Sequence, residues 1–253
     1  MTELAKCTWP EAAEVLGTRT VAILPIGCTE PHGPHLALDT DVTIAVAQSQ
    51  RAAERLAEAG VTAVVLPPLS YGLTNFTDGF AGRVTLRPGT LWALLEDIVM
   101  SLEQQNVLQI VFSNGHLEPQ HVEILRGVAG DHTERGKQRA QVLFPDNTRR
   151  RWAETLGAAF AKGDHAGAYE SSIMLAADPD AVRDEARRAL PSVDIDLIGA
   201  IRGGADSFLS AGCDAAYCGD PAAATPEEGE RLVGLLADML VTSIRETWPE
   251  LFA

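Results

Sequence analysis

Short apolar segments that end at turn-forming residues constrain the fold of this chain most strongly. Residues 21–27 end at a glycine, residues 62–66 precede Pro67-Pro68, and residues 108–112 precede Ser113-Asn114-Gly115; residues 141–144 form a weaker fourth segment. Continuous apolar runs of this length are typical of strands that are buried on both faces, as in a parallel sheet. They predict four such strands.

Longer segments with helical periodicity lie between and after these runs. They span residues 41–59, 91–105, 122–129 and 226–247, and the last has Thr225 as a candidate N-cap with Pro226 at its first position. Regular alternation of strand and helix predicts a doubly wound α/β fold. Residues 203–225 are rich in Gly and Ala, and we expect a long loop there.

Carboxylates and imidazoles are concentrated in three short segments. These are Glu30-Pro31-His32-Gly33-Pro34-His35 followed by Asp41, then Asn114-Gly115-His116-Leu117-Glu118, and then His165-Ala166-Gly167-Ala168-Tyr169-Glu170. The first two segments directly follow predicted strands. Because ligands bind beyond the carboxyl ends of parallel strands, we expect these two segments to meet at one edge of the sheet.

The spacing of these residues suits a pair of metal ions. Glu30 and His32, two residues apart in extended backbone, point to the same side, and His116 and Glu118 repeat this spacing. Asp41 could bridge two ions with its two oxygens. Mixed nitrogen and oxygen ligands without cysteine suit Zn, Mn or Fe. Three carboxylates leave one positive charge on two divalent ions, which a bridging hydroxide would neutralise.

Each segment alone has a simpler interpretation. Asp39 and Asp41 could be an N-cap pair, and Asn114-Gly115 is a common turn. His165 could either transfer a proton or cap the helix expected near Glu170. His35 could orient a metal ligand, whereas His121 and His132 are expected at the surface. The three segments together favour a site.

Composition excludes other classes of function. The net charge of −15 disfavours binding to nucleic acid. Gly-x-Gly-x-x-Gly, P-loop and Gly-x-Ser-x-Gly motifs are absent from the sequence. No apolar run is long enough to span a membrane, and residues 1–6 lack the pattern of a signal peptide. The four cysteines show no CxxC pair. We expect reduced thiols and a cytoplasmic protein.

Over essentially its whole length the chain resembles the creatininase (creatinine amidohydrolase) family. The resemblance rests on the three segments above, with Pro25 to Glu30 before the first and Met174-Leu175 after the third, and on Gly219-Asp220-Pro221 with Thr225 and Gly229. It implies one domain over residues 1–253, a three-layer α/β/α fold with a mainly parallel central sheet, and a homo-oligomer, which in this family is often a hexamer.

The resemblance also implies a role for each site residue. Two divalent ions per chain, Zn first and Mn or Fe as alternatives, would activate a bridging hydroxide that opens a small cyclic amide. Glu30 and His116 would hold one ion, His32 and Glu118 the other, and Asp41 both. Glu118 would also be catalytic. The remaining roles are proton transfer by His165, a supporting position or further ligand at Glu170, and a supporting position at His35.

Several positions depart from the family pattern around the substrate. Thr77 replaces a histidine, Thr74 a serine that helps to bind creatinine, Leu117 a tyrosine, and Ala161 a gating tryptophan. Arg83 is an additional cation. We therefore expect a cyclic amide that is bulkier than creatinine or carries a carboxylate paired with Arg83. The expected substrate contacts are Thr74, Arg83, Leu117 and Asp164.

Two other functions compete with opening of a lactam. Some relatives are formamidopyrimidine deformylases or mycofactocin precursor peptidases. Those relatives tend to have Gly-Gly after the second-motif histidine, whereas this chain has Leu117-Glu118, which favours the cyclic amide. A metal-stabilised protein without catalysis is disfavoured because the whole ligand set and His165 are present.

Overall fold

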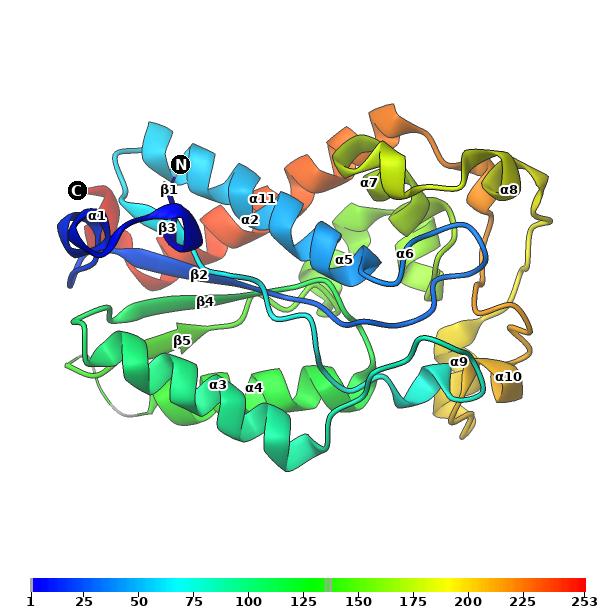
Figure 1. Cartoon of the computed structure of the whole chain (residues 1–253), viewed down its shortest axis with the longest axis horizontal. Coiled ribbons are helices and arrows are strands. Elements are labelled where there is room, and N and C mark those ends of the chain that lie inside the picture. The colour runs from blue at the N-terminus through cyan, green and yellow to red at the C-terminus, as the bar shows by residue number, and fades with distance from the viewer. Residues whose placement is uncertain (1, 135, 137) are drawn as a thin grey trace.

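One parallel sheet lies between two layers of helices in the computed structural model, which describes residues 2–134, 136 and 138–253 (Figure 1). Within this part of the chain the sheet has five strands in the order β1-β3-β2-β4-β5, all parallel. The strands are β1 (Thr2–Glu3), β2 (Val21–Ile26), β3 (Ala63–Val65), β4 (Gln109–Asn114) and β5 (Gln141–Leu143). The predicted α/β class and the buried parallel strands are confirmed.

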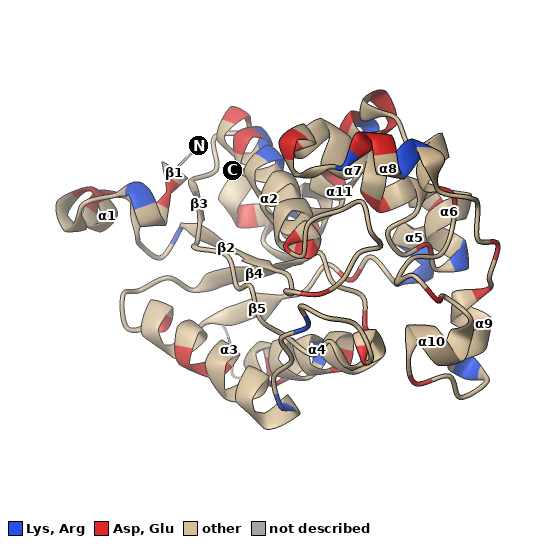
Figure 2. Ribbon diagram, turned by 45° about the vertical axis from the view of Figure 1, so that its right-hand side comes forward, with Lys and Arg blue, Asp and Glu red and all other residues tan. Residues whose placement is uncertain are grey.

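The helices cover both faces of the sheet and extend beyond its carboxyl end. They are α1 (Trp9–Val15), α2 (Thr40–Glu58), α3 (Pro88–Glu103), α4 (Pro119–Thr133), α5 (Arg150–Leu156), α6 (Ala158–Lys162), α7 (Ala168–Ala177), α8 (Asp184–Ala189), α9 (Leu197–Arg202), α10 (Phe208–Ala211) and α11 (Pro226–Thr247). Acidic residues are spread over the helices of both layers (Figure 2), as the net charge of −15 leads one to expect.

Alternate residues of the strands build two separate cores. Val21 and Ile23 pack with α2, α7 and α11, whereas Ala22 and Leu24 pack with α3 and α4 on the other face. Successive side chains of a strand point to opposite faces, so a strand covered on both sides must be apolar throughout. This is why β2 has no polar residue.

The connections around β2 and β4 leave a crevice between the ends of these neighbouring strands. From β2 the chain passes through α2 to β3 on one side, and from β4 it passes through α4 to β5 on the other. Because α2 and α4 belong to opposite layers, the segments that follow β2 and β4 diverge. Ligand sites of open α/β sheets form at such a switch point.

The observed helices match the predicted segments to within a few residues. α11 has the predicted bounds, and Thr225 Oγ1 accepts a hydrogen bond from the Glu228 N–H at 3.2 Å. α3 and α4 begin earlier than predicted, each with a proline at its first position. The expected loop over residues 203–225 contains the short helix α10 and a 3₁₀ turn at Pro221–Ala223.

The expectation that His121 and His132 lie at the surface is wrong, because both are fully buried. They lie on one face of α4 together with Leu125 and Val128, at the spacing of a helical stripe. His132 Nε2 lies 3.0 Å from a carboxylate oxygen of Glu96. The helical periodicity of residues 121–132 could have identified both histidines as buried.

The expectation of reduced cysteines is also wrong for one pair. Cys213 and Cys218 form a disulfide, while Cys7 and Cys28 are free. Their four intervening residues fall outside the CxxC pattern, so the spacing did not indicate a bond. None of the helices in the described ranges has the length and apolar character needed to cross a membrane. Cytoplasmic location and homo-oligomerisation stay predictions.

Candidate metal centre

Three segments bring buried ionisable side chains together at the switch point. Glu30 and His32 follow β2, Asp41 lies in the first turn of α2, and His116 follows β4. Glu170 comes from the first turn of α7, which packs against α2 and α11. The helix dipoles of α2 and α7 favour negative charge at their first turns, where Asp41 and Glu170 lie.

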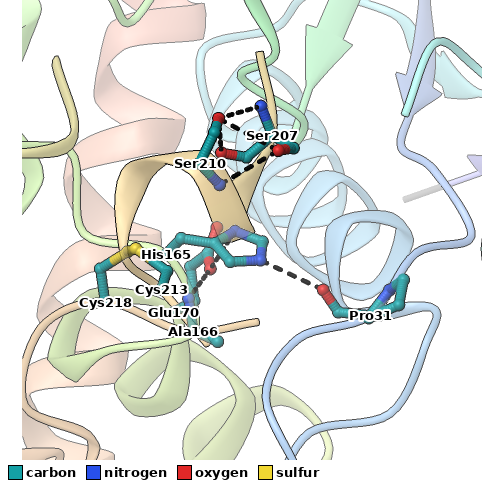
Figure 3. Close-up of a disulfide and its surroundings, with 8 residues drawn as sticks. All are labelled: Pro31, His165, Ala166, Glu170, Ser207, Ser210, Cys213 and Cys218. Atoms are coloured by element: carbon teal, nitrogen blue, oxygen red, sulfur yellow. Dashed lines mark hydrogen bonds and ion pairs between the residues drawn. A yellow bond between two sulfur atoms is a disulfide. The ribbon is translucent and has the colours of Figure 1, made fainter. Parts of the chain in front are cut away.

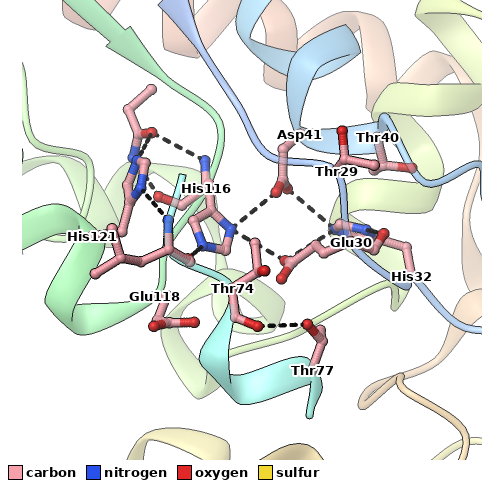
Figure 4. A network of polar contacts seen from close by, with 12 residues as sticks. Thr29, Glu30, His32, Thr40, Asp41, Thr74, Thr77, His116, Glu118 and His121 are labelled. Atoms are coloured by element: carbon pink, nitrogen blue, oxygen red, sulfur yellow. Dashed lines mark hydrogen bonds and ion pairs between the residues drawn. The ribbon is translucent and has the colours of Figure 1, made fainter. Parts of the chain in front are cut away.

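Asp41 occupies the centre of the cluster and directs its two oxygens to different histidines (Figure 4). Its Oδ1 lies 3.1 Å from His32 Nε2, and its Oδ2 lies 2.9 Å from His116 Nδ1. Glu30 Oε1 lies 3.1 Å from His116 Nδ1, and Glu170 Oε2 lies 3.7 Å from His32 Nε2. A carboxylate with one oxygen toward each histidine has the geometry expected of a bridging ligand.

Backbone carbonyls orient the two histidines toward Asp41. His32 Nδ1–H donates to the carbonyl of Glu30 at 3.1 Å, and His116 Nε2–H donates to that of Leu73 at 2.6 Å. A carbonyl can only accept, so the opposite ring nitrogen is the one that can offer a lone pair to an ion. Contacts of this kind are typical around metal-binding histidines.

Several atoms at the centre are buried and make no hydrogen bond of good geometry within the described ranges, although Asp41 lies close to both histidines. They are Glu30 Oε2, His32 Nε2 and Asp41 Oδ2. Unpaired buried polar atoms are costly, and three around one point require a compensating group. The buried side chains close enough to share an ion form four groups: Glu30–Asp41–His116, His32–Asp41–Glu170, Glu30–His32–His165 and Cys28–His116–His121.

The group with Cys28 is a poor candidate for an ion. Burial raises the pKa of the Cys28 thiol to about 12, which disfavours the thiolate that would bind an ion, and His121 Nδ1 already accepts a hydrogen bond from the Leu73 N–H at 3.4 Å. His116 Nε2, which faces away from Asp41, already donates to the carbonyl of Leu73. His121 Nε2–H donates to the side-chain oxygen of Asn114 at 3.2 Å. This group therefore supports His116 from behind.

Glu118 lies apart from the cluster, in contrast to the expected ligand set (Figure 4). Its carboxylate accepts hydrogen bonds from the Asn75 side chain and the Phe76 backbone N–H, each at 3.1 Å. Burial raises its pKa. Among the described residues, Glu170 and not Glu118 is the carboxylate next to His32 and Asp41.

His165 lies against the same cluster and has one free ring nitrogen. Its Nε2–H donates to the carbonyl of Pro31 at 3.1 Å, and its Nδ1 lies 3.8 Å from Glu170 Oε2. Burial, together with the charge of His32, lowers the pKa of His165 well below its usual range. The ring is therefore neutral near pH 7, with Nδ1 as the proton acceptor. His35 is turned away and contacts the Ser171 hydroxyl at 3.0 Å.

Known proteins similar to this chain point to one family. The family model described as creatininase, creatinine amidohydrolase, matches residues 5–244. The chain belongs to the creatininase family. It is 31% identical over 234 residues to a mycofactocin precursor peptide peptidase of Mycolicibacterium smegmatis, covering 91% of this chain and 86% of that protein. It is 27% identical over 269 residues to the creatinine amidohydrolase of Pseudomonas putida, covering 97% of each.

Solved creatininase structures have the same fold. A creatininase variant of Zn-Zn type superposes with a TM-score of 0.74 at 24% identity, over 98% of each chain. A creatininase with Mn superposes with a TM-score of 0.73 at 23% identity, over 98% of this chain and 99% of that one. The three-layer creatininase fold expected from the sequence is confirmed.

In this member of the creatininase family a cavity of about 640 Å³ opens onto the cluster. Its wall includes the predicted substrate contacts Leu117 and Asp164 but, within the described ranges, neither Thr74 nor Arg83. Arg83 instead pairs with Asp78 at 2.9 Å, and Thr74 is fully buried. The idea that Arg83 binds a substrate carboxylate therefore has no support in the structure.

Much of the cavity wall was not anticipated from the sequence. Apolar side chains of α6, α9 and α10 line it together with three arginines: Phe160, Leu197, Ile198, Ile201, Phe208, Arg126, Arg150 and Arg202. Apart from Arg126 on α4, these residues lie on short helices without a motif. The Ala161 position, where the family pattern has a tryptophan, also lies on this wall.

The first turn of α2 lies against both strand ends because glycines leave room for it. A Cβ on Gly115 would overlap the backbone oxygen of Asp41, and one on Gly27 would overlap the backbone of Val42. Gly115→Ala should therefore move His116 away from Asp41. We expect a loss of stability of about 1–3 kcal/mol and a weaker metal centre, measured by urea unfolding and metal content.

Gly130→Ala is the matched control for Gly115→Ala. A Cβ on Gly130 would meet nothing within 4 Å, and this residue is exposed in α4. We expect Gly130→Ala to keep the ions and to raise stability by about 0.5–1 kcal/mol, because alanine is the better helix former. Equal behaviour of the two variants would contradict the close approach at Gly115.

Binding of ions should depend on pH through His32. Burial lowers the pKa of His32, but the carboxylates of Asp41, Glu170 and Glu30 outweigh it and raise the pKa to about 10. An ion must displace this proton from Nε2. Between pH 7 and pH 9 we expect the metal affinity to rise at least about tenfold per pH unit, because binding of the ion releases one proton from His32. Calorimetric titration in two buffers measures the released protons; a pH-independent affinity would contradict the assignment.

Proposed function

We propose that this chain is a metal-dependent amidohydrolase with two divalent ions per chain. Glu30, Asp41 and His116 would hold one ion, and His32, Asp41 and Glu170 the other. The observation that supports this proposal most directly is the orientation of Asp41, which directs one oxygen toward each histidine. Buried polar atoms without a hydrogen bond of good geometry lie around it. Imidazole and carboxylate donors fit Zn, and also Mn or Fe. Solved relatives of Zn-Zn type and with Mn support this choice.

The donor set fits the chemistry that such ions supply, namely acidified water at neutral pH and a polarised carbonyl. The chain's own residues would do the rest. His165 is neutral and offers Nδ1 toward Glu170, so it would accept a proton there and give it to the departing nitrogen. Glu118 faces the same cavity, and burial raises its pKa, which would make its carboxyl group a second candidate for proton transfer.

A peptide amide is the substrate that the observations support best. The relative with 31% identity is a mycofactocin precursor peptide peptidase. The cavity of about 640 Å³ lies in the range of pockets for drug-sized ligands, far larger than a single five-membered ring needs. Its apolar wall would suit a peptide segment with bulky apolar side chains.

Opening of a cyclic amide is the second candidate. Leu117-Glu118 replaces the Gly-Gly expected of the peptidases and deformylases, and both side chains lie on the cavity wall. A carboxylate at this position favours the lactam hypothesis. The two candidates share the metal centre and differ only in what the cavity holds.

Turnover of a substrate panel separates these candidates. Protein purified without chelators would be tested with hydrophobic linear peptides, creatinine, hydantoins, other lactams and an N-formyl amide. We expect about two ions per chain and release of peptide fragments, detected by mass spectrometry. Lactam opening without peptide cleavage would support the second candidate. An absence of ions and of all turnover would refute the amidohydrolase.

A further inference from the structure

The ring of His165 contacts two other rings. The ring of Phe208 is stacked on it, with 4.1 Å between the centroids and an interplanar angle of 21°, and the ring of His32 is tilted by 35° with its centroid at 4.5 Å. Phe208 in turn meets the ring of Phe76 edge-on at 5.6 Å. Both Phe208 and His165 are buried. The stacking restricts how the imidazole plane can tilt.

Three links in series, namely a pair of backbone hydrogen bonds, a disulfide and a further hydrogen bond, connect His165 to Phe208. The backbones of His165 and Cys218 are paired by hydrogen bonds in both directions, at 2.8 and 3.2 Å. Cys218 is joined to Cys213 by the disulfide, and Cys213 N–H donates to the carbonyl of Phe208 at 2.8 Å. Figure 3 shows the disulfide beside His165, with the helix of Ser207 and Ser210 above it. Phe208 is therefore connected to His165 both through these bonds and through direct contact between the two rings.

We propose that Phe208 is a positioning residue for His165 and that the Cys213–Cys218 disulfide holds it in place. This inference rests on the proposed function, since it concerns the proton-transfer step. The hydrogen bond from His165 Nε2–H to the Pro31 carbonyl fixes one edge of the ring, so the motion that remains is a tilt of the ring plane. The ring of Phe208, stacked on one face of the imidazole, limits this tilt and keeps Nδ1 directed toward the candidate metal centre.

The rest of α10 has little other anchorage. It is four residues long, begins at a capping box between Ser207 and Ser210, and carries the exposed Leu209. Phe208, Leu197, Cys213 and Cys218 make a small apolar cluster separate from both main cores. A helix this short gains little from its own hydrogen bonds, so a cross-link matters more to its position.

Reduction opens the Cys213–Cys218 disulfide without a mutation. A dithiol breaks the Sγ–Sγ bond: two electrons and two protons pass from the dithiol to the cysteine sulfurs, which become thiols, and the dithiol closes to its own disulfide. Disulfides are rare in reducing compartments. If the protein is cytoplasmic, the reduced form would be the common one there.

The test compares oxidised protein with protein reduced by dithiothreitol and then desalted, both reloaded with zinc to equal content. On the panel substrate that the wild type hydrolyses fastest, we expect kcat to fall roughly 10- to 100-fold on reduction, with a smaller change in KM. Cys213→Ala with Cys218→Ala should match the reduced protein and ignore the reductant. An equal kcat in both forms would overturn the proposal, as would a double variant that responds to dithiothreitol.

Variants of α10 separate positioning from bulk packing. Phe208→Tyr should keep most of kcat because it keeps the ring, whereas Phe208→Leu should lower kcat more than it raises KM. Leu209→Ala, on the same helix but exposed, is the control and should behave like the wild type. Equal kcat for Phe208→Leu and Phe208→Tyr would contradict a role for the planar face.

A spectroscopic readout keeps this test independent of turnover. The ring current of Phe208 should shift the His165 ring protons in NMR spectra of protein with isotope-labelled histidine, and His165→Gln assigns the signal. Reduction or Phe208→Leu should move that signal toward its ordinary position, and an unmoved signal would refute the proposal. Wild type that hydrolyses nothing while the signal responds would refute only the proposed function.

Discussion

Asp41→Asn should abolish binding of both ions and lower turnover roughly 10³-fold or more, because no water in the site would then be acidified toward neutral pH. An amide keeps the size of the side chain but offers only one acceptor oxygen. It therefore cannot bind one ion beside His32 and another beside His116 at the same time. Metal content per chain by mass spectrometry, with circular dichroism to verify folding, measures the effect.

Asp39→Ala is the control for this variant. Asp39 is exposed, precedes α2 and makes no side-chain cap hydrogen bond, although it shares the Asp-x-Asp segment with Asp41. We expect unchanged metal content and activity. A folded Asp41→Asn protein that retained two ions would show that Asp41 does not bridge them.

His165→Gln should lower kcat roughly 10²–10⁴-fold with both ions retained, the usual cost of removing a general acid or base. The expectation follows from the neutral ring and from Nδ1, which faces Glu170 beside the cavity. Glutamine can still donate to the Pro31 carbonyl, so the local fold should persist. Steady-state kinetics at equal zinc content measures the loss.

His132→Gln provides a comparison at a distant site. His132 is buried on α4 and contacts Glu96, outside the cavity wall. This variant should affect stability more than kcat. If both histidine variants lowered kcat alike, or if His165→Gln lost its ions, the proton-transfer role of His165 would be contradicted.

The sequence predicted the sheet, and the close approach of the polar residues at the ends of its strands, for a physical reason. A strand covered on both faces must be apolar along its length, which made β2 and β4 visible. The polar residues at their ends then had to lie together because the strands are neighbours. This argument brings Glu30, His32 and His116 together, and Asp41 joins them from the first turn of α2.

Tertiary packing, which the spacing of residues along the chain does not reveal, determines that Glu170 and not Glu118 lies beside His32 and Asp41. The two-residue spacing of His116 and Glu118 assumes extended backbone, but Glu118 is the N-cap of α4, and Asn75 and Phe76 hold its carboxylate. Glu170 reaches the cluster only because α7 packs against α2 and α11. The stacking of Phe208 on His165 likewise joins residues far apart in the chain.

The metal centre and the cavity wall come from different parts of the chain. The candidate ligands lie on the segments after β2 and β4 and on the first turn of α7, whereas the outer wall comes from α5, α6, α9 and α10. Substitutions in α5, α6 and α9 can therefore change what fits without altering the groups that act on the bond, whereas Phe208 on α10 contacts His165. Such mutational independence would let one scaffold diversify its substrates, and it makes residues 148–163 and 195–202 the segments to exchange when the specificity is redesigned.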